Sequence, residues 1–524
     1  MSSFPWLTIL LVVPLVGAAV VALLPKRGDA ALPKQVALAV SVLTLVIAAV
    51  VGVGYDVGAG MQFTEEYTWI SAFGAHYALG VDGIGLTLVL LTVILVPVVI
   101  LASWNDADPA TGPGHAPARW SVNSFFAWML ALEGLALGVF MATDVFLFYV
   151  LFEATLLPVY FLIGGFGGVR RSYAAVKFLL YSLLGGLLML ASVIGLYVVS
   201  ADSEFGPTYL LSELTQVQMD QNVARWLFLG FFVAFAIKAP MFPVHTWLPD
   251  AAAAGTPGTS VLLVSILDKI GTFGMIRFGL GLFPEASQWA TPVVLVLAVI
   301  SVLYGALLAI GQNNIPRLIA YTSVSHFGFI VLGIFVLNSQ GQVGSTLYMF
   351  NHGLSTAALF LVTGFLIRRR GSQLISDFGG VEKVAPVLAG LFLVAGLSSL
   401  SLPGLSPFVS EFLVLVGTFA YNWWFAVFAV LGIVLAALYI LLMYQRTMTG
   451  APVPAVASMR DLGVREISAL APLLVLIVVL GFYPKPLTAI IEPAVQDTLQ
   501  QVGVSDPAPD VPASAGSGEE EESH

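Results

Sequence analysis

Apolar runs of roughly 20 residues recur along the whole chain, and they constrain its fold more than any other feature. A run of this length allows an α-helix to cross the hydrocarbon core of a bilayer. Charged residues make up 10% of the 524 residues, against about 25% in a soluble domain. The apolar character is continuous rather than alternating, which excludes a membrane β-barrel. We therefore expect an all-α polytopic membrane protein.

Glycine, proline and charged residues divide these runs into about 14 expected membrane-spanning helices. Two of them, at residues 225–249 and 385–420, contain a pair of prolines beside a charged residue: Pro240 and Pro243 follow Lys238, and Pro403 and Pro407 precede Glu411. Proline removes an N–H donor and interrupts a helix. Interrupted membrane helices point to a transport site, although a passive packing kink is the alternative.

Basic residues alternate between the loops, and 14 of the 20 lysines and arginines lie in loops on one predicted side. Cytoplasmic loops carry such an excess. The opposite loops collect acidic residues, so both termini are expected to face away from the cytoplasm. The first apolar run has basic residues after it rather than before it, which favours a first span over a cleaved signal.

The two interrupted spans are the seventh and the twelfth, and a repeat of five helices would be inverted because five is odd. We expect an N-terminal three-span region (1–121), a first five-helix repeat (122–285) and a second, inverted five-helix repeat (286–446). A C-terminal span and a surface amphipathic helix are expected at 447–502. A disordered acidic tail is expected at 503–524.

Glu133 falls inside a predicted span, and four titratable residues lie well inside theirs: Glu153, Lys238, Lys269 and Glu411. Each costs about 3 kcal/mol near the bilayer centre. Burial brings the proton affinities of an amine and a carboxylic acid closer together, which suits proton exchange near neutral pH. These residues therefore predict a proton relay, and structural ion pairs are the alternative.

Two histidines, His326 and His352, also fall inside spans and could hand protons on through either ring nitrogen. Haem ligation or hydrogen-bonded core positions are the alternatives. Arg277 lies near the end of its span, where it can reach the interface. Lys177 could do the same or serve function, and Asp268 could partner another helix or raise the local polarity.

The chain has no cysteine. Disulfides, thiolate-bound zinc and iron–sulfur clusters held by this chain are therefore excluded. No pattern predicts a metal or cofactor site, and nothing indicates nucleic acid binding. Any redox chemistry is expected on partner subunits.

Five segments together resemble the antiporter-like membrane subunits of respiratory complex I. They are FYVLFEATLLPVYFLIGG (148–165), AAVKFLLYSLLGGLLML (174–190), KAPMFPVHTWLPDA (238–251), RLIAYTSVSHFGFI (317–330) and LPGLSPFVSEFLVL (402–415). The resemblance runs over roughly residues 80–450. It departs at residues 252–256, and Asn314 and Pro316 stand where relatives commonly carry charges, which puts a charged cytoplasmic gate there in doubt.

The resemblance implies a half-channel in each repeat and a polar axis along the membrane midplane. It assigns Glu153 and Lys238 as a pair, Lys269 as the residue that passes charge to the second repeat, and His326 and His352 to the axis. It further implies that Glu411 faces the exit or the next subunit and that Glu133 matches a glutamate of less settled role.

We therefore expect a proton-translocating subunit of NADH:quinone oxidoreductase in a bacterial inner membrane. The resemblance implies NADH, FMN, iron–sulfur clusters and quinone on partner subunits. The expected partners are other membrane subunits, including homologous antiporter-like ones, and the lipid bilayer. A subunit of a cation/proton antiporter, a membrane-bound hydrogenase subunit and a structural anchor are the alternatives.

Overall fold

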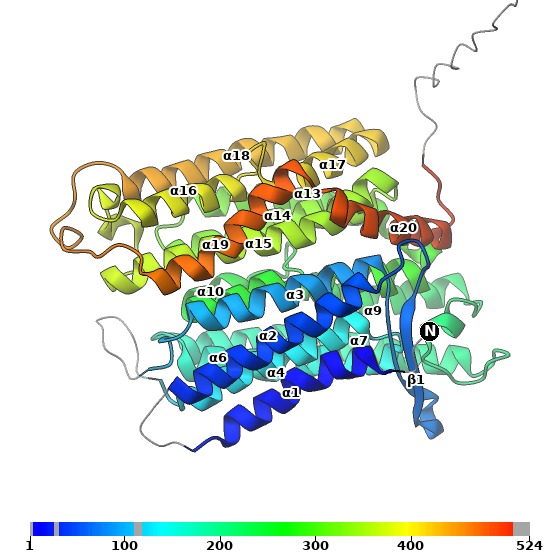
Figure 1. Ribbon diagram of the computed structural model, residues 1–524. Coiled ribbons are helices and arrows are strands. Elements are labelled where there is room, and N and C mark those ends of the chain that lie inside the picture. The colour runs from blue at the N-terminus through cyan, green and yellow to red at the C-terminus, as the bar shows by residue number, and fades with distance from the viewer. Residues whose placement is uncertain (1–3, 26–30, 109–117, 507–524) are drawn as a thin grey trace, which may run out of the picture.

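A computed structural model describes residues 4–25, 31–108 and 118–506. Its helices run side by side between two ends (Figure 1). The end that we call the hairpin end carries strands β1 (Gln62–Ile70) and β2 (Ala75–Val81) together with the start of the first helix. The opposite end, called the arginine end, carries the side chains of Arg170, Arg317 and Arg368.

The helices of the first half of the chain are α1 (Trp6–Leu23), α2 (Ala31–Val53), α3 (Gly83–Ala102), α4 (Val122–Met141), α5 (Val145–Ala154), α6 (Leu156–Phe166), α7 (Arg171–Ser200), α8 (Leu211–Leu214), α9 (Gln221–Lys238), α10 (Leu248–Ala254) and α11 (Pro257–Val261). A short 3₁₀ turn, η1 (Ser71–Phe73), joins the two strands.

The second half continues with η2 (Leu262–Leu267), α12 (Asp268–Gly274), η3 (Met275–Leu280), α13 (Pro284–Ile310), α14 (Ile315–Phe335), α15 (Ser339–Arg370), α16 (Pro386–Ser399), α17 (Ser406–Tyr421), α18 (Trp423–Met448), α19 (Val464–Phe482) and α20 (Lys485–Val502). Two 3₁₀ turns, η4 (Ile375–Asp377) and η5 (Val381–Lys383), lie before α16.

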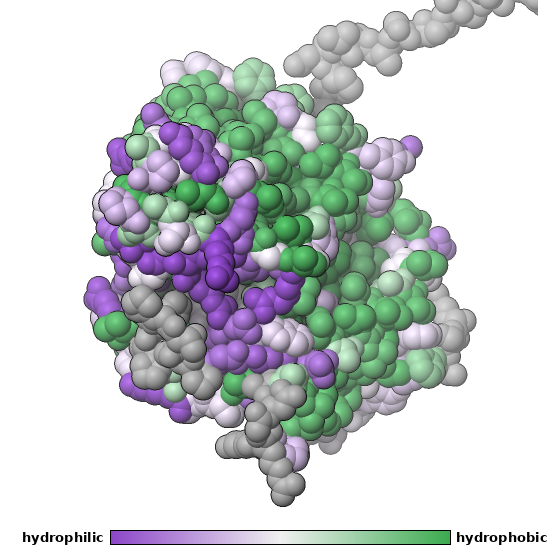
Figure 2. Space-filling model, turned by 60° about the vertical axis from the view of Figure 1, so that its left-hand side comes forward, coloured by the Kyte–Doolittle hydropathy of each residue, from purple (hydrophilic) through white to green (hydrophobic). Residues whose placement is uncertain are grey.

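Twelve helical stretches of the described residues are long and apolar enough to span a membrane, judged by length and composition. Their exposed apolar side chains are concentrated on α2, α7, α13 and α18. Figure 2 shows this apolar surface along the flank and hydrophilic residues gathered at the arginine end. An apolar flank between two polar ends is what a bilayer requires, so the expected polytopic helical membrane fold is confirmed.

The two predicted helix interruptions are present. Helix α9 ends at Lys238, and the chain becomes helical again only at α10. Helix α16 ends at Ser399, and α17 begins at Ser406 with Pro407 in its first turn. Proline is tolerated in the first turn of a helix but not in its interior, so these prolines fix where the helices stop and restart.

Two further irregularities lie in spans that sequence analysis treats as regular. The span predicted at residues 145–165 is divided at Thr155 into α5 and α6. The span predicted at residues 258–281 contains two π-helical segments, η2 and η3, on either side of α12. A π-helical turn shifts the backbone hydrogen bonds by one residue and frequently marks a functional site.

Helix α15 forms the centre of the molecule. Every residue from Gly341 to Leu366 is buried, and the helix packs on α3, α14, α16, α17, α19 and α20. Polar residues can therefore lie along it without meeting the hydrocarbon of the bilayer.

The hairpin end is held to the bundle by Asp144, which is fully buried. The side chain of Asp144 accepts hydrogen bonds from the backbone N–H of Leu147 in α5 and of His76 in β2, both at 2.8 Å. Asp144 thus caps α5 and fixes the hairpin at once. Sequence analysis predicts no strand here, although Phe63, Tyr67 and Trp69 are residues that favour strands.

The predicted amphipathic helix at the C-terminus is present as α20. Its apolar residues, including Ile491 and Val495, are buried against α3 and α15. The amide of Gln288 donates a hydrogen bond of 2.8 Å to the carbonyl of Val502. The apolar face of α20 therefore covers the protein itself. Most of the expected acidic tail, from residue 507 on, lies outside the described residues.

Candidate functional site

The first group of buried polar residues surrounds Lys238, the last residue of α9. The side chain is 1% exposed. Its Nζ donates a long hydrogen bond of 3.4 Å to Oγ1 of Thr155 and lies 4.8 Å from the centre of the Phe152 ring. The interruption of α9 after Lys238 and the division between α5 and α6 at Thr155 place these two side chains together.

Glu153 lies on α5, two residues before Thr155. A Cβ atom on Gly186 of α7 would meet the Glu153 carboxylate, so the glycine leaves room for this side chain against α7. Oε1 of Glu153 has no hydrogen-bond partner in the part of the chain that the structure describes. Glu153 and Lys238 interact electrostatically, but no ion pair of 4.0 Å or less joins them there, so the pair is open.

The second group begins at Lys269 on α12, which is fully buried. Its Nζ donates a hydrogen bond of 2.7 Å to the carbonyl of Val264, in the π-helical segment η2. The same Nζ lies 2.8 Å from Nδ1 of His352 on α15. The shifted hydrogen bonding of η2 gives the lysine a backbone acceptor inside the bundle.

From His352 the polar groups continue across α14, α15 and α17. The rings of His352 and His326 are 5.3 Å apart, centre to centre. Nδ1 of His326 lies 2.6 Å from the hydroxyl of Tyr348, which donates a hydrogen bond of 3.1 Å to Oε2 of Glu411. Ser401, in the interruption before α17, also donates to Oε2 of Glu411. All five side chains are buried.

Four of the predicted site residues, Lys269, His326, His352 and Glu411, are therefore brought into one line, and Glu153 and Lys238 form a separate group. Glu133 is 1% exposed on α4, and neither of its carboxylate oxygens has a hydrogen-bond partner among the described residues. Glu133 is buried as expected but takes part in no hydrogen bond of either group.

Sequence analysis misses three members of the site: Thr155, Tyr348 and Ser401. Tyr348 lies one turn before His352 on the same helix, and residues four apart share a helix face. That spacing is the signal that could have identified the tyrosine. Thr155 and Ser401 carry no such signal, because their roles depend on where the helices are interrupted.

Ion pairs fix both ends of the bundle. At the arginine end, Asp250 accepts from Nζ of Lys177 at 2.7 Å and from Arg317 at 2.5 Å. Burial alone would raise the pKa of Asp250, but the hydrogen bonds from Lys177 and Arg317 lower it below its usual value. Lys177 therefore belongs to a cluster of charged side chains with Asp250 and Arg317. Arg317 directly follows Pro316, where the sequence puts a charged cytoplasmic gate in doubt.

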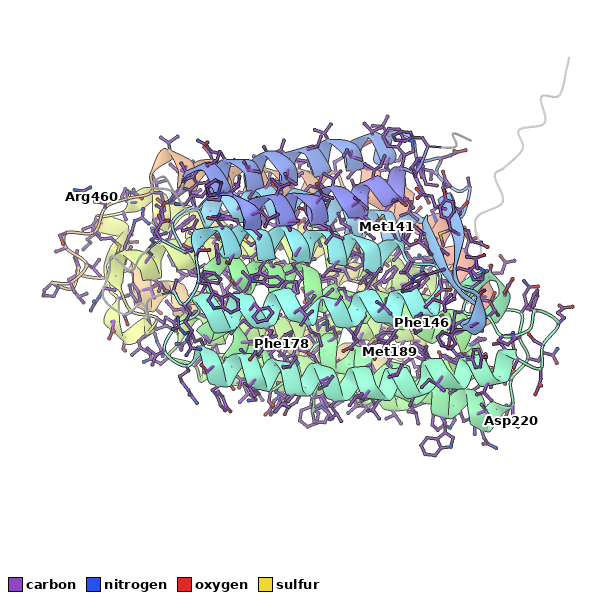
Figure 3. The ribbon with its side chains drawn as sticks, turned by 90° about the horizontal axis from the view of Figure 1, so that it is seen from below. Met141, Phe146, Phe178, Met189, Asp220 and Arg460 are labelled. Carbon is purple, nitrogen blue, oxygen red and sulfur yellow. The ribbon has the colours of Figure 1, made fainter. Side chains whose placement is uncertain are left out.

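At the hairpin end, Arg277 pairs with Asp82 at 2.5 Å, and the two side chains are only 12% and 13% exposed. Arg277 thus joins η3 to the residue that caps α3 at this end of the bundle. Figure 3 shows the helices between the two ends, with Asp220 and Arg460 at opposite extremes.

A cavity of about 610 Å³ opens at the arginine end. Asp250, Arg317, Ser260 and Thr363 lie in its wall. A polar cavity at the end of the bundle gives water a place beside the second half of the interrupted helix.

The fold and these buried groups together define a helical membrane protein of the kind that moves ions through its interior. Comparison with known families gives the particular one. The chain belongs to the family described as NADH:quinone oxidoreductase/Mrp antiporter, whose transmembrane profile matches residues 142–436.

Its relatives include NADH-quinone oxidoreductase subunit M of Mycobacterium tuberculosis, which is 52% identical, with 98% of this chain and 97% of the relative covered. Subunit M of Rhodobacter capsulatus is 38% identical, with 94% and 96% covered.

Among solved structures, a chain of respiratory complex I from Thermus thermophilus matches with a TM-score of 0.84 and 30% identity, covering 95% of this chain and all of that one. A chain of the Mrp complex from Dietzia matches with the same TM-score but 22% identity, covering 96% of this chain and 100% of that chain, which shows a shared fold.

Proposed function

We propose that this chain is a proton-translocating membrane subunit of an NADH:quinone oxidoreductase. Its similarity to relatives named NADH-quinone oxidoreductase subunit M supports this proposal. It acts as a subunit of an enzyme complex, beside other membrane subunits that include homologous antiporter-like ones. The NADH, FMN, iron–sulfur clusters and quinone of the reaction belong to partner subunits. The complex is placed in a bacterial inner membrane, with both termini of this chain on the non-cytoplasmic side.

The observation that carries this proposal is the line of buried titratable groups from Lys269 to Glu411. Nζ of Lys269 donates to Nδ1 of His352, which accepts when its ring proton is on Nε2. Tyr348 donates to Glu411, and Nδ1 of His326 can donate to the Tyr348 hydroxyl in the tautomer that carries its proton on Nδ1. In that tautomer a proton can pass from His326 through Tyr348 to Glu411.

Electron transfer in partner subunits would drive proton transfer along the line from Lys269 to Glu411 by opening and closing the Glu153–Lys238 pair. An open Glu153–Lys238 pair leaves the lysine free to release its proton toward α12, and a closed pair holds that proton. Moving one charge against 100 mV requires about 2.3 kcal/mol, which a downhill redox reaction can supply.

The positions of the two interruptions support the inverted repeats that we propose for residues 122–285 and 286–446. Lys238 precedes one interruption and Glu411 follows the other, in corresponding helices of two five-helix units. Residues 1–121 and 447–502 would then flank the repeats as additional spans and the covering helix α20.

A cation/proton antiporter subunit is the alternative, since the family includes both kinds of protein. The two solved structures have equal TM-scores, so the fold does not separate them. The 52% and 38% identities to relatives named subunit M favour the oxidoreductase. Purification from native membranes distinguishes the two, because only the oxidoreductase brings flavin and iron–sulfur subunits with it.

The test of translocation is Lys238→Ala in the assembled complex. We expect the number of protons moved per electron to fall while NADH-reducing subunits remain attached. Lys485→Ala is the matched control, because Lys485 is an exposed lysine at the start of α20. An unchanged proton-to-electron ratio in Lys238→Ala would remove this lysine from the route.

A further inference from the structure

The two groups of the site are separated within the bundle. No hydrogen bond or ion pair in the described ranges joins Lys238 to Lys269, although the route described above requires a proton to pass from one to the other. Helix α12 carries Lys269 and packs on α9, the helix that ends at Lys238, and its Lys269 contacts α15. A residue of α12 is therefore well placed to connect the two lysines.

One face of α12 lies directly against the end of α9. A Cβ atom on Gly271 would be 2.5 Å from the backbone N of Ala239 and from the carbonyl of Phe235. Asp268 is three residues before Gly271, and residues three apart share a helix face. Asp268 is therefore on the side of α12 that faces the interruption after Lys238.

The neighbouring face of α12 contacts α15. Lys269 contacts His352 there, and Oγ1 of Thr272, three residues on, lies 2.9 Å from Sδ of Met349. Consecutive residues of a helix point about 100° apart. Asp268 and Lys269 are thus adjacent in sequence but turned toward the two different groups of the site.

The surroundings of Asp268 suit a group that exchanges protons. The residue is fully buried, and neither carboxylate oxygen has a hydrogen-bond partner in the described part of the chain. The hydroxyl of Ser265, three residues earlier, is also buried without a hydrogen-bond partner among the residues that the structure describes. Leaving such groups unsatisfied is costly, and water can satisfy a site with several polar partners.

Asp268 also interacts electrostatically with both lysines. Neither lysine lies within ion-pair distance of it, so Asp268 is not simply the counter-ion of one of them. Its position between the two amines is the relationship that a connecting carboxylate requires.

We propose that Asp268 is the proton-carrying residue that connects the Lys238 group to the Lys269 line, an inference that rests on the proposed function. In the first step an N–H bond of the Lys238 ammonium breaks and an O–H bond forms on the Asp268 carboxylate, through water. In the second step that O–H bond breaks and an N–H bond forms on the neutral amine of Lys269. Charge and atoms balance, and no electron is transferred.

The experiment compares Asp268→Asn with Asp268→Glu in the assembled complex, measuring protons moved per electron during NADH oxidation. Asparagine keeps the size and polarity but has no titratable proton, so we expect the loss of the protons that pass this subunit. Glutamate keeps the titratable proton, and we expect translocation to be retained. Thr291→Val is the control with no expected change, because Thr291 is a buried residue of α13 whose hydroxyl donates to the carbonyl of Ser287 in its own helix.

An unchanged proton-to-electron ratio in Asp268→Asn overturns the inference. If Lys238→Ala lowers the ratio in the same membranes, the proposed function stands and only the role of Asp268 fails. If both variants leave the ratio unchanged, the proposed function itself fails. Should Asp268→Asn not assemble, Asp268→Ala gives the same test, with the same expected loss and the same overturning result.

Discussion

The hydroxyl of Tyr348 donates a hydrogen bond of 3.1 Å to Oε2 of Glu411, across the contact between α15 and α17. Nδ1 of His326 approaches the same hydroxyl at 2.6 Å. A phenol can accept one proton while it gives up another. Tyr348 is thereby the only direct connection among the described residues between the histidines and Glu411.

Replacing Tyr348 by phenylalanine should interrupt translocation, because it removes this hydroxyl and keeps the ring. We expect fewer protons per electron in the assembled complex, measured in sealed vesicles with NADH. Tyr439→Phe is the control, since Tyr439 is equally buried but its hydroxyl has no partner within the described ranges. Equal loss in both variants would attribute the effect to packing.

A methyl group added at Gly186 should disturb the first group without changing any charge. The new Cβ would meet the Glu153 carboxylate, which is the far end of a flexible side chain, so the carboxylate must move from its present position. We expect Gly186→Ala to lower the rate of NADH-driven proton translocation. Gly164→Ala is the control, because its nearest neighbour, the Cβ of Ala175, lies at an ordinary 3.5 Å. Normal translocation in Gly186→Ala would mean that Glu153 moves aside without consequence.

Asp250→Asn should loosen the arginine end, since Asp250 joins α7, α10 and α14 through Lys177 and Arg317. We expect a loss of about 2 kcal/mol, measured as a lower thermal unfolding midpoint. The pKa of Asp250 is lowered, so this stabilisation is present at neutral pH and is lost as the pH falls below the usual aspartate range. The exposed Asp202→Asn should change neither value.

Asp144 should make the hairpin end less stable as the pH rises, which is the opposite of the pH dependence expected for Asp250. Burial raises its pKa from 3.8 to about 6, against the lowering effect of its backbone hydrogen bonds. The folded state therefore binds the proton more tightly, and stability should fall as the pH rises from about 4 to about 6. Asp144→Asn should abolish that slope in a pH series of thermal unfolding. A slope that persists in the variant would assign it to other groups.

Much of the fold is predictable from sequence because proline acts locally. The pairs beside Lys238 and Glu411 stop and restart helices wherever the rest of the protein lies, and apolar periodicity identifies α20 in the same way. The role of Arg277 is different. Its partner, Asp82, is distant in sequence, so only the folded bundle reveals the ion pair.

The parts of the site that escape prediction depend on contacts between helices. The π-helical turn that offers the carbonyl of Val264 to Lys269 has no sequence signature as plain as proline. The line through Tyr348 likewise depends on α14, α15 and α17 packing together. The hairpin is the exception, because its aromatic residues could have been recognised as a strand.

Lys269, His326 and His352 lie near the middle of three membrane-spanning stretches, and Glu411 lies on a fourth helix, α17. Movement from one to the next is therefore sideways, along the plane of the bilayer. A transmembrane voltage does work only on displacement along the membrane normal. Transfers along this line would be electrically silent, and the cost of charging the membrane would fall on the steps that connect it to the two aqueous compartments.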